Sequence, residues 1–215
     1  MPEIKPLTTK SEQEKKQRQQ FKIIVGIIIA VLMIASTIGY AVLEREHGQK
    51  QGTASYNNYT FQKTETGWQT SLKINNQDIA LNTFNLPQDV ENISTQGSPL
   101  LANFMNKVIY IVAASQEERK AAIEYNALGK FALRIQLACS QKNENETFCV
   151  ENNLPIKSCD DVDWQTVIIM LEELGENSND SATINYKNSC LEIKGKKEEL
   201  VKANEKALFM IFGII

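Results

Sequence analysis

An uninterrupted apolar run at residues 23–43 constrains this chain more than any other feature; it reads IIVGIIIAVLMIASTIGYAVL. No charged side chain occurs in it. As a helix it would be about 31 Å long, close to the thickness of the hydrocarbon core of a bilayer. A helix also satisfies its own backbone hydrogen bonds, as the lipid interior requires. The sequence therefore predicts a transmembrane helix at residues 23–43, with the lipid bilayer as a partner.

The charges beside this run predict its orientation. Residues 1–22 form a polar tail with six basic side chains, whereas only Arg45 and Lys50 occur over a comparable distance after the run. Basic residues are retained on the cytoplasmic side of a membrane. We therefore expect a cytoplasmic basic tail at residues 1–22 and an extracytoplasmic domain after residue 43, in a single-pass protein of the cell membrane.

A cleavable signal peptide is the alternative reading of the same run. The apolar region of a signal peptide normally spans about 7–15 residues, which is shorter than residues 23–43. Gly39-Tyr40-Ala41 nevertheless has the small residues of a cleavage site. The length of the run favours an uncleaved signal anchor, and cleavage stays open.

The composition is that of a folded protein without affinity for nucleic acid. Hydrophobic residues make up 42% of the chain and charged residues 23%, a balance that argues against intrinsic disorder. The formal net charge of −3 provides no basic field for a phosphate backbone, so nucleic acid is not expected as a partner.

After a polar linker at residues 44–55, the pattern predicts a three-stranded β meander at residues 56–95. Its expected strands are residues 59–64, 68–74 and 79–86, where apolar and polar side chains alternate or β-favouring residues cluster. We expect a small core made of its four aromatic residues, Tyr59, Phe61, Trp68 and Phe84.

Residues 96–215 are expected to form an α/β domain. The continuous apolar runs 108–113 and 167–171 predict adjacent central strands covered on both faces. Ser115 and Glu118 form a capping box that starts a helix expected to end near Ala138. Further expected elements are a short helix at Ser98-Pro99, strands at 182–186 and 190–194, and a closing helix from Lys197 to Gly213. The fold class is α/β or α+β, with a mixed sheet covered by helices.

The four cysteines all follow the apolar run, and they predict two disulfides if that side of the membrane is oxidising. Cys139 and Cys149 enclose a short polar loop, while Cys159 precedes one expected strand and Cys190 opens another. We therefore pair Cys139 with Cys149 and Cys159 with Cys190. Four reduced, buried thiols are the alternative. No CxxC occurs, and the spacings do not match a zinc site.

No catalytic residue, metal ligand or cofactor site is assigned. Carboxylates cluster in two places that could bind a cation or act as acid and base, but a solvated loop and a solvated strand end are the favoured readings. These residues are Asp160, Asp161, Asp163, Glu172, Glu173 and Glu176. The only histidine is His47, beside the apolar run, and no glycine-rich phosphate loop or serine nucleophile elbow is present.

Asn-x-Ser/Thr sequons agree with an extracytoplasmic domain, because glycosylation occurs on the translocated side. Four are present, at Asn58, Asn92, Asn145 and Asn179. In a chain with this much asparagine, serine and threonine, about half that number would arise by chance, so the sequons give only weak support.

Two resemblances can be stated. The segments Asn188–Gly195, Glu199-Leu200-Val201 and Phe212-Gly213-Ile214, with Leu86-Pro87 and Val90–Ile93 upstream, resemble uncharacterised archaeal single-pass membrane-anchored proteins, which imply no activity. The order of strand, helix, strands and helix from Val108 onward is similar to a thioredoxin-like core. A thioredoxin-like enzyme would have a CxxC after its first strand, where Val112-Ala113-Ala114-Ser115 stands here.

These observations favour a membrane-anchored, extracytoplasmic and non-enzymatic domain that binds proteins or assists envelope assembly, with an envelope protein as partner. One alternative is a thioredoxin-like thiol-redox accessory protein. A second alternative is a subunit of a larger membrane complex.

The predicted orientation can be tested with protease. Protease added to intact cells should digest the domain after Leu43 and leave the tail before Ile23, because only the domain is expected outside. Immunoblots against each part would follow the digestion. A domain that is protected until the cells are lysed would contradict the orientation.

Overall fold

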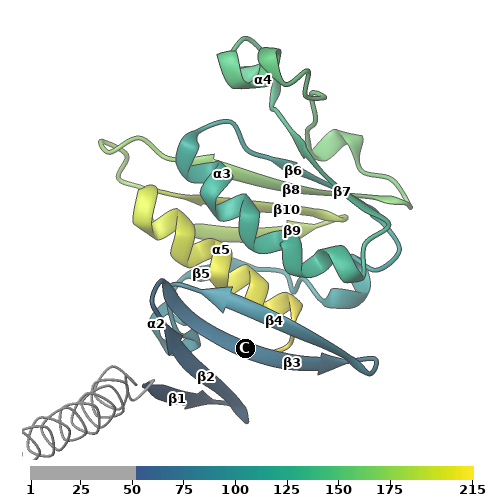
Figure 1. The fold of residues 1–215 in the computed structure, drawn as a ribbon. Coiled ribbons are helices and arrows are strands. Elements are labelled where there is room, and N and C mark those ends of the chain that lie inside the picture. The colour runs from purple at the N-terminus through teal and green to yellow at the C-terminus, as the bar shows by residue number, and fades with distance from the viewer. Residues whose placement is uncertain (1–51) are drawn as a thin grey trace, which may run out of the picture. The chain divides into compact units, whose positions relative to one another are not determined.

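Two β-sheets with helices between them make up residues 52–215, which are the residues that the computed structural model describes (Figure 1). The predicted tail, transmembrane helix and most of the linker lie outside these residues. Within residues 52–215, no helix is both long and apolar enough to cross a membrane. The mixed α/β class that the sequence predicts is confirmed at this level.

The first sheet is antiparallel and has four strands, one more than expected. They run in the order β1 (Thr53–Tyr56), β2 (Tyr59–Thr64), β3 (Gly67–Ile74) and β4 (Gln77–Thr83). Residues 53–55, which the sequence predicts as linker, pair with β2. The segment is short and partly polar, so no clear alternation predicts a strand there.

The aromatic core expected for this sheet is only partly correct. Phe61 is completely buried, and Tyr59 and Trp68 are partly buried. Phe84 is 58% exposed, because β4 ends one residue before it.

The connection between the sheets contains short elements. Pro87 begins α2 (Pro87–Val90), where its fixed φ suits the first helical turn. The strand β5 (Ser94–Gln96) and the 3-10 turn η1 (Leu101–Asn103) follow. The helix expected at Ser98-Pro99 is wrong, since the short turn begins after Leu100.

The second sheet has six strands in the order β5-β9-β10-β8-β6-β7. Four of them are parallel: β6 (Val108–Val112), β7 (Arg134–Ala138), β8 (Thr166–Glu173) and β10 (Cys190–Gly195). The strand β9 (Thr183–Lys187) is antiparallel to β10 and parallel to β5. The prediction that the two apolar runs form adjacent inner strands is confirmed, because β6 pairs directly with β8.

The long helix expected up to Ala138 is wrong. The helix α3 (Gln116–Ile123) passes into the 3-10 segment η2 (Glu124–Lys130), and β7 then begins at Arg134. In β7, Ile135 and Leu137 pack against the main core, whereas Gln136 lies on the opposite face. Ile135 and Ala138 continue the apolar spacing of the predicted helix by coincidence. Three further short segments are η3 (Gln141–Asn143), α4 (Thr147–Glu151) and η4 (Cys159–Asp161).

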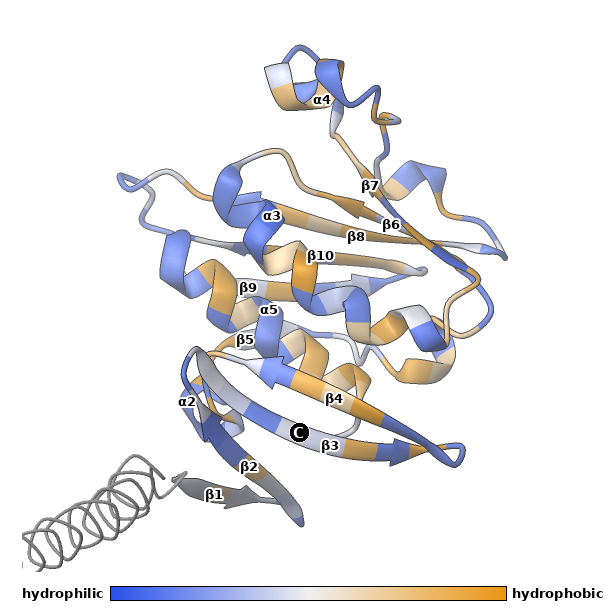
Figure 2. Ribbon diagram, viewed as in Figure 1, coloured by the Kyte–Doolittle hydropathy of each residue, from blue (hydrophilic) through white to orange (hydrophobic). Residues whose placement is uncertain are grey.

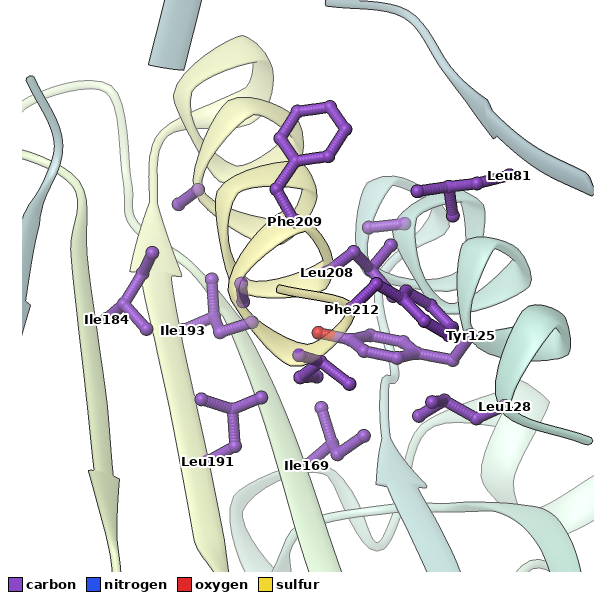
Figure 3. Close-up of a cluster of buried hydrophobic side chains, with 14 of the residues drawn as sticks. Leu81, Tyr125, Leu128, Ile169, Ile184, Leu191, Ile193, Leu208, Phe209 and Phe212 are labelled. Carbon is purple, nitrogen blue, oxygen red and sulfur yellow. The ribbon is translucent and has the colours of Figure 1, made fainter. Parts of the chain in front are cut away.

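The closing helix α5 (Lys197–Ile211) lies at the centre of this unit, and its predicted position is confirmed. Figure 3 shows Leu208 of α5, and Phe212 directly after the helix, among Leu191 and Ile193 of β10 and Tyr125 of η2. Phe209 points the other way, and its ring meets Phe61 of β2 edge to face at 6.0 Å. In Figure 2 the inner strands are orange and the loops at the ends of the six-stranded sheet are blue. The two sheets therefore share α5 as a common core.

Three consecutive polar residues in the middle of α5 bind three different segments. Asn204 donates to the carbonyl oxygen of Ala121 in α3 at 3.0 Å. Glu205 is completely buried and accepts hydrogen bonds from the backbone and side chain of Asn85 and from the amide of Phe84. Lys206 donates to two backbone carbonyl groups at 2.7 Å, those of Glu91 and Ile93. Successive helical residues point about 100° apart, so these three residues connect α5 to its surroundings in three directions.

Glu124 lies beside this trio and is held in its protonated form. Burial and the nearby charge of Glu205 raise the pKa of Glu124 from 4.5 to about 9, although Asn204 donates to it at 2.7 Å. Burial also raises the pKa of Glu205 to about 7, against the opposing effect of its hydrogen bonds from Asn85 and Phe84. Within residues 52–215, Glu124 Oε1, Tyr125 Oη and Asn204 Oδ1 are buried without a hydrogen-bond partner.

Stability should fall as the pH rises from about 5 to about 9. Both carboxyl groups have folded-state pKa values above 4.5, so the native state retains protons that the unfolded chain has released. Their contribution is complete below about pH 4.5 and is lost as the pH passes about 7 and about 9. Glu124→Gln should weaken this dependence and stabilise the protein at pH 8 by on the order of 2 kcal/mol. Chemical unfolding of the full chain in mild detergent at several pH values would measure it; an unchanged slope would contradict the assignment.

Candidate functional site

The structure pairs the four cysteines in the connectivity that the sequence predicts. The Cα atoms are 6.2 Å apart for Cys139 and Cys149 and 5.5 Å apart for Cys159 and Cys190, within the range of disulfides. Cys139 extends β7, since its amide donates to Pro155 O at 2.9 Å. The Cys159–Cys190 bridge lies against Ile168 and Met170, on the face of the six-stranded sheet that the helices leave uncovered.

The carboxylates singled out in the sequence do not form a common site. Asp161 accepts from the backbone of Ser158 at 2.8 Å, which holds the pKa of Asp161 below its usual value. Asp163 accepts from the backbone of Gln165 at 2.7 Å, which lowers the pKa of Asp163 in the same way. Within residues 52–215, no group of acidic, histidine or cysteine side chains is arranged to hold a metal ion.

A crevice of about 330 Å³ lies at the carboxyl ends of β6 and β8. The chain leaves β6 through α3 toward β7 on one side, while β8 lies on the other side. Ligands of open α/β sheets bind at such switch points. This position is therefore where a small-molecule site would be expected in this fold.

A carboxylate of the chain itself already occupies the anion-binding part of this crevice. Glu118 Oε2 accepts from the amides of Ala114 and Ser115 at 2.7 and 3.0 Å. Its other oxygen, Oε1, accepts from the amide of Glu173 at 2.9 Å. The predicted capping box of Ser115 and Glu118 is thus confirmed. Because the Glu118 carboxylate already lies at the amino-terminal end of α3, a second anion such as a phosphate is disfavoured there.

The remaining polar groups of the crevice are also paired. Ser115 donates from its hydroxyl group to Glu173 Oε2 at 2.8 Å. Glu172 forms an ion pair with Lys194 at 2.9 Å and lies 3.8 Å from Lys142, and the bond from Lys194 lowers the pKa of Glu172. The hydroxyl group of Ser115 is thus bonded to a carboxyl group and not to a histidine of the kind that activates a serine nucleophile. The crevice therefore has no evident catalytic arrangement.

An exposed apolar patch lies at the other end of the parallel strands. We call it the strand-start patch and define it as Leu133 and Trp164, which precede β7 and β8, with Lys107 between them before β6. Leu133 is 69% exposed and Trp164 is 78% exposed. The amide of Leu133 donates to Lys107 O, and the amide of Val108 donates to Gln165 O, both at 2.8 Å. Periodicity does not reveal this patch, because each residue lies in a loop and only strand pairing brings them together.

Removing the disulfides should destabilise the protein by amounts that follow the loop lengths. The chain-entropy relation gives about 4 kcal/mol for the Cys159–Cys190 bridge and about 3 kcal/mol for the Cys139–Cys149 bridge. Replacing each pair with alanine and measuring chemical unfolding without reductant would test this. Peptide mapping of the unreduced full chain is the control. Free thiols or crossed pairs would contradict the assignment.

Comparisons of the chain with models of known protein families, with curated proteins and with solved structures found no match. The archaeal and thioredoxin-like resemblances therefore stay predictions.

Proposed function

We propose that this chain is a single-pass membrane protein whose extracytoplasmic domain binds another envelope protein and is not an enzyme. The observation that carries the proposal is the strand-start patch of Leu133, Lys107 and Trp164. Tryptophan is strongly enriched among the residues that dominate binding energy at protein interfaces. Two large apolar side chains exposed at the starts of the two strands that flank β6 fit a partner with an apolar pocket.

The charges around the patch indicate the chemistry of this partner. Asp160 and Asp163 are exposed close to Trp164 in the chain, and Lys107 lies near Asp163. A basic rim around an apolar pocket would complement the aspartates, and it would make association weaker at high salt.

The cysteines support this function over a thiol-redox activity. Redox enzymes require an accessible thiolate of lowered pKa. Cys139, Cys149 and Cys190 are buried, and all four cysteines are paired in the described residues. Such bridges suit a structural role in an oxidising compartment.

The sequons are compatible with the proposed location. Their asparagines, Asn58, Asn92, Asn145 and Asn179, are all exposed. Each could accept a glycan without disturbing the core.

The partner can be captured by photocrosslinking in intact cells of the native host. We expect the full chain with a photoreactive residue in place of Trp164 or Leu133 to give one discrete adduct. The same residue in place of exposed Lys197 is the matched control, because Lys197 follows the carboxyl end of β10 and so lies at the opposite end of the sheet. The double variant Leu133→Ala and Trp164→Ala should lose capture from a crosslinker placed at Gln165, with little change in stability because both side chains are exposed.

Two results would decide against this function. If the patch positions give no adduct, or the same adducts as position 197, the patch does not bind a partner. If the domain unfolds when extracted without its partner, the alternative of an obligate complex subunit is favoured.

A further inference from the structure

The end of the four-stranded sheet where the chain emerges from residue 51 has one exposed aromatic side chain, Phe84, and a partly buried one, Trp68. Gly52 lies beside the end of β2, since Lys63 donates from its amide to Gly52 O at 2.8 Å. Trp68 of β3 pairs with Lys63 on one side and with Thr83 on the other. Phe84, the next residue after Thr83, is 58% exposed.

The side chains of this end are held close together. The Lys63 ammonium group lies 5.8 Å from the centre of the Trp68 ring. Gly67, next to Trp68, packs so closely against the end of β4 that an added Cβ would be 2.2 Å from Thr83 O and 3.0 Å from Phe84 Cα. We call Lys63, Trp68 and Phe84 the sheet-end cluster. Strand pairing holds the backbone of Lys63 and Trp68 in place. The backbone amides of Phe84 and Asn85 donate hydrogen bonds to buried Glu205.

The length of chain before Gly52 limits what this cluster can face. Eight residues, 44–51, separate the predicted transmembrane helix from Gly52, and even fully extended they span at most about 29 Å. A domain the size of residues 52–215 has a radius of gyration of about 15 Å and hence a diameter of about 40 Å. The side opposite Gly52 therefore cannot be the one that rests on the bilayer.

The composition of the cluster matches the interfacial region of a membrane. Tryptophan and lysine side chains anchor proteins at the level of the lipid head groups, where an aromatic ring can lie partly in apolar surroundings. Lys63 is accompanied by exposed Glu65 in the next turn, so the contact needs no anionic lipid. Phe84 supplies the apolar side chain that enters the acyl boundary.

We infer that the sheet-end cluster is a lipid-contact surface, through which the domain rests on the outer leaflet of its own membrane. This inference rests on the proposed anchoring of the chain. It assigns Trp68 and Phe84 to the bilayer, whereas the strand-start patch of Trp164 serves a protein partner. Docked in this way, the domain presents a defined orientation to that partner.

The chain has two tryptophans, and they allow a direct test. The full chain would be reconstituted in phosphatidylcholine vesicles with and without lipids brominated on acyl carbons near the head group. Trp164→Phe leaves Trp68 as the fluorophore, and Trp68→Phe leaves Trp164 as the matched control. We expect brominated lipid to quench Trp68 emission and to leave Trp164 emission unchanged. A tryptophan placed by Phe84→Trp in a chain without the other two should also be quenched.

Each outcome separates the two proposals. If the protein floats with the vesicles and resists alkaline extraction, but neither Trp68 nor the tryptophan at position 84 is quenched, the lipid-contact surface is overturned and the anchor stands. If the protein does not float, the anchor itself fails, and the inference fails with it. Phe84→Asp should reduce the quenching of Trp68 while circular dichroism remains unchanged, because Phe84 is exposed.

Discussion

The burial of α5 between two sheets is the constraint on which the rest of residues 52–215 depends. A helix that is covered on several sides normally has only apolar side chains in its middle turns. This one instead buries Asn204, Glu205 and Lys206 and gives each a backbone partner in a different segment. Buried polar groups cost stability when one partner is lost. These bonds therefore fix where α3, the end of β4 and the α2–β5 connection lie around the helix, which apolar packing alone would specify less sharply.

The sequence correctly predicts the helices and strands that depend on the local residue pattern. It fails for segments that become strands only by pairing with a neighbouring strand. The inner strands β6 and β8 and the capping box at Ser115 follow from residue type alone. The edge strands β1 and β7 do not, because a short, partly polar segment becomes a strand only when it can hydrogen-bond to an adjacent strand. The helix predicted up to Ala138 failed for this reason: Ile135 and Ala138 continue a helical spacing, whereas Ile135 and Leu137 form the inward face of a strand.

The candidate sites were predictable to different degrees for the same reason. The cysteine pairing could be predicted from the short loop between Cys139 and Cys149 and from the position of Cys159 and Cys190 beside two strands. The exposed surfaces could not be found in this way. Leu133 and Trp164 are about thirty residues apart in the sequence, and only the parallel alignment of β7, β6 and β8 places them together. Phe84 was predicted as core, because nothing in its neighbourhood indicates that β4 stops at Thr83.

Small-molecule sites of open α/β sheets usually lie at the carboxyl ends of the parallel strands. In this chain its own side chains bind the polar groups at that position. The amides that begin α3 could bind a phosphate, yet Glu118 accepts from the preceding two and from Glu173 of the neighbouring strand. One side chain thus caps the helix and joins it to β8, and the hollow that remains is lined by side chains already paired. Large exposed apolar side chains include Leu133 and Trp164 at the starts of the strands and Phe84 at the end of the other sheet. The proposed binding of a protein partner therefore rests on rigid surfaces away from this crevice.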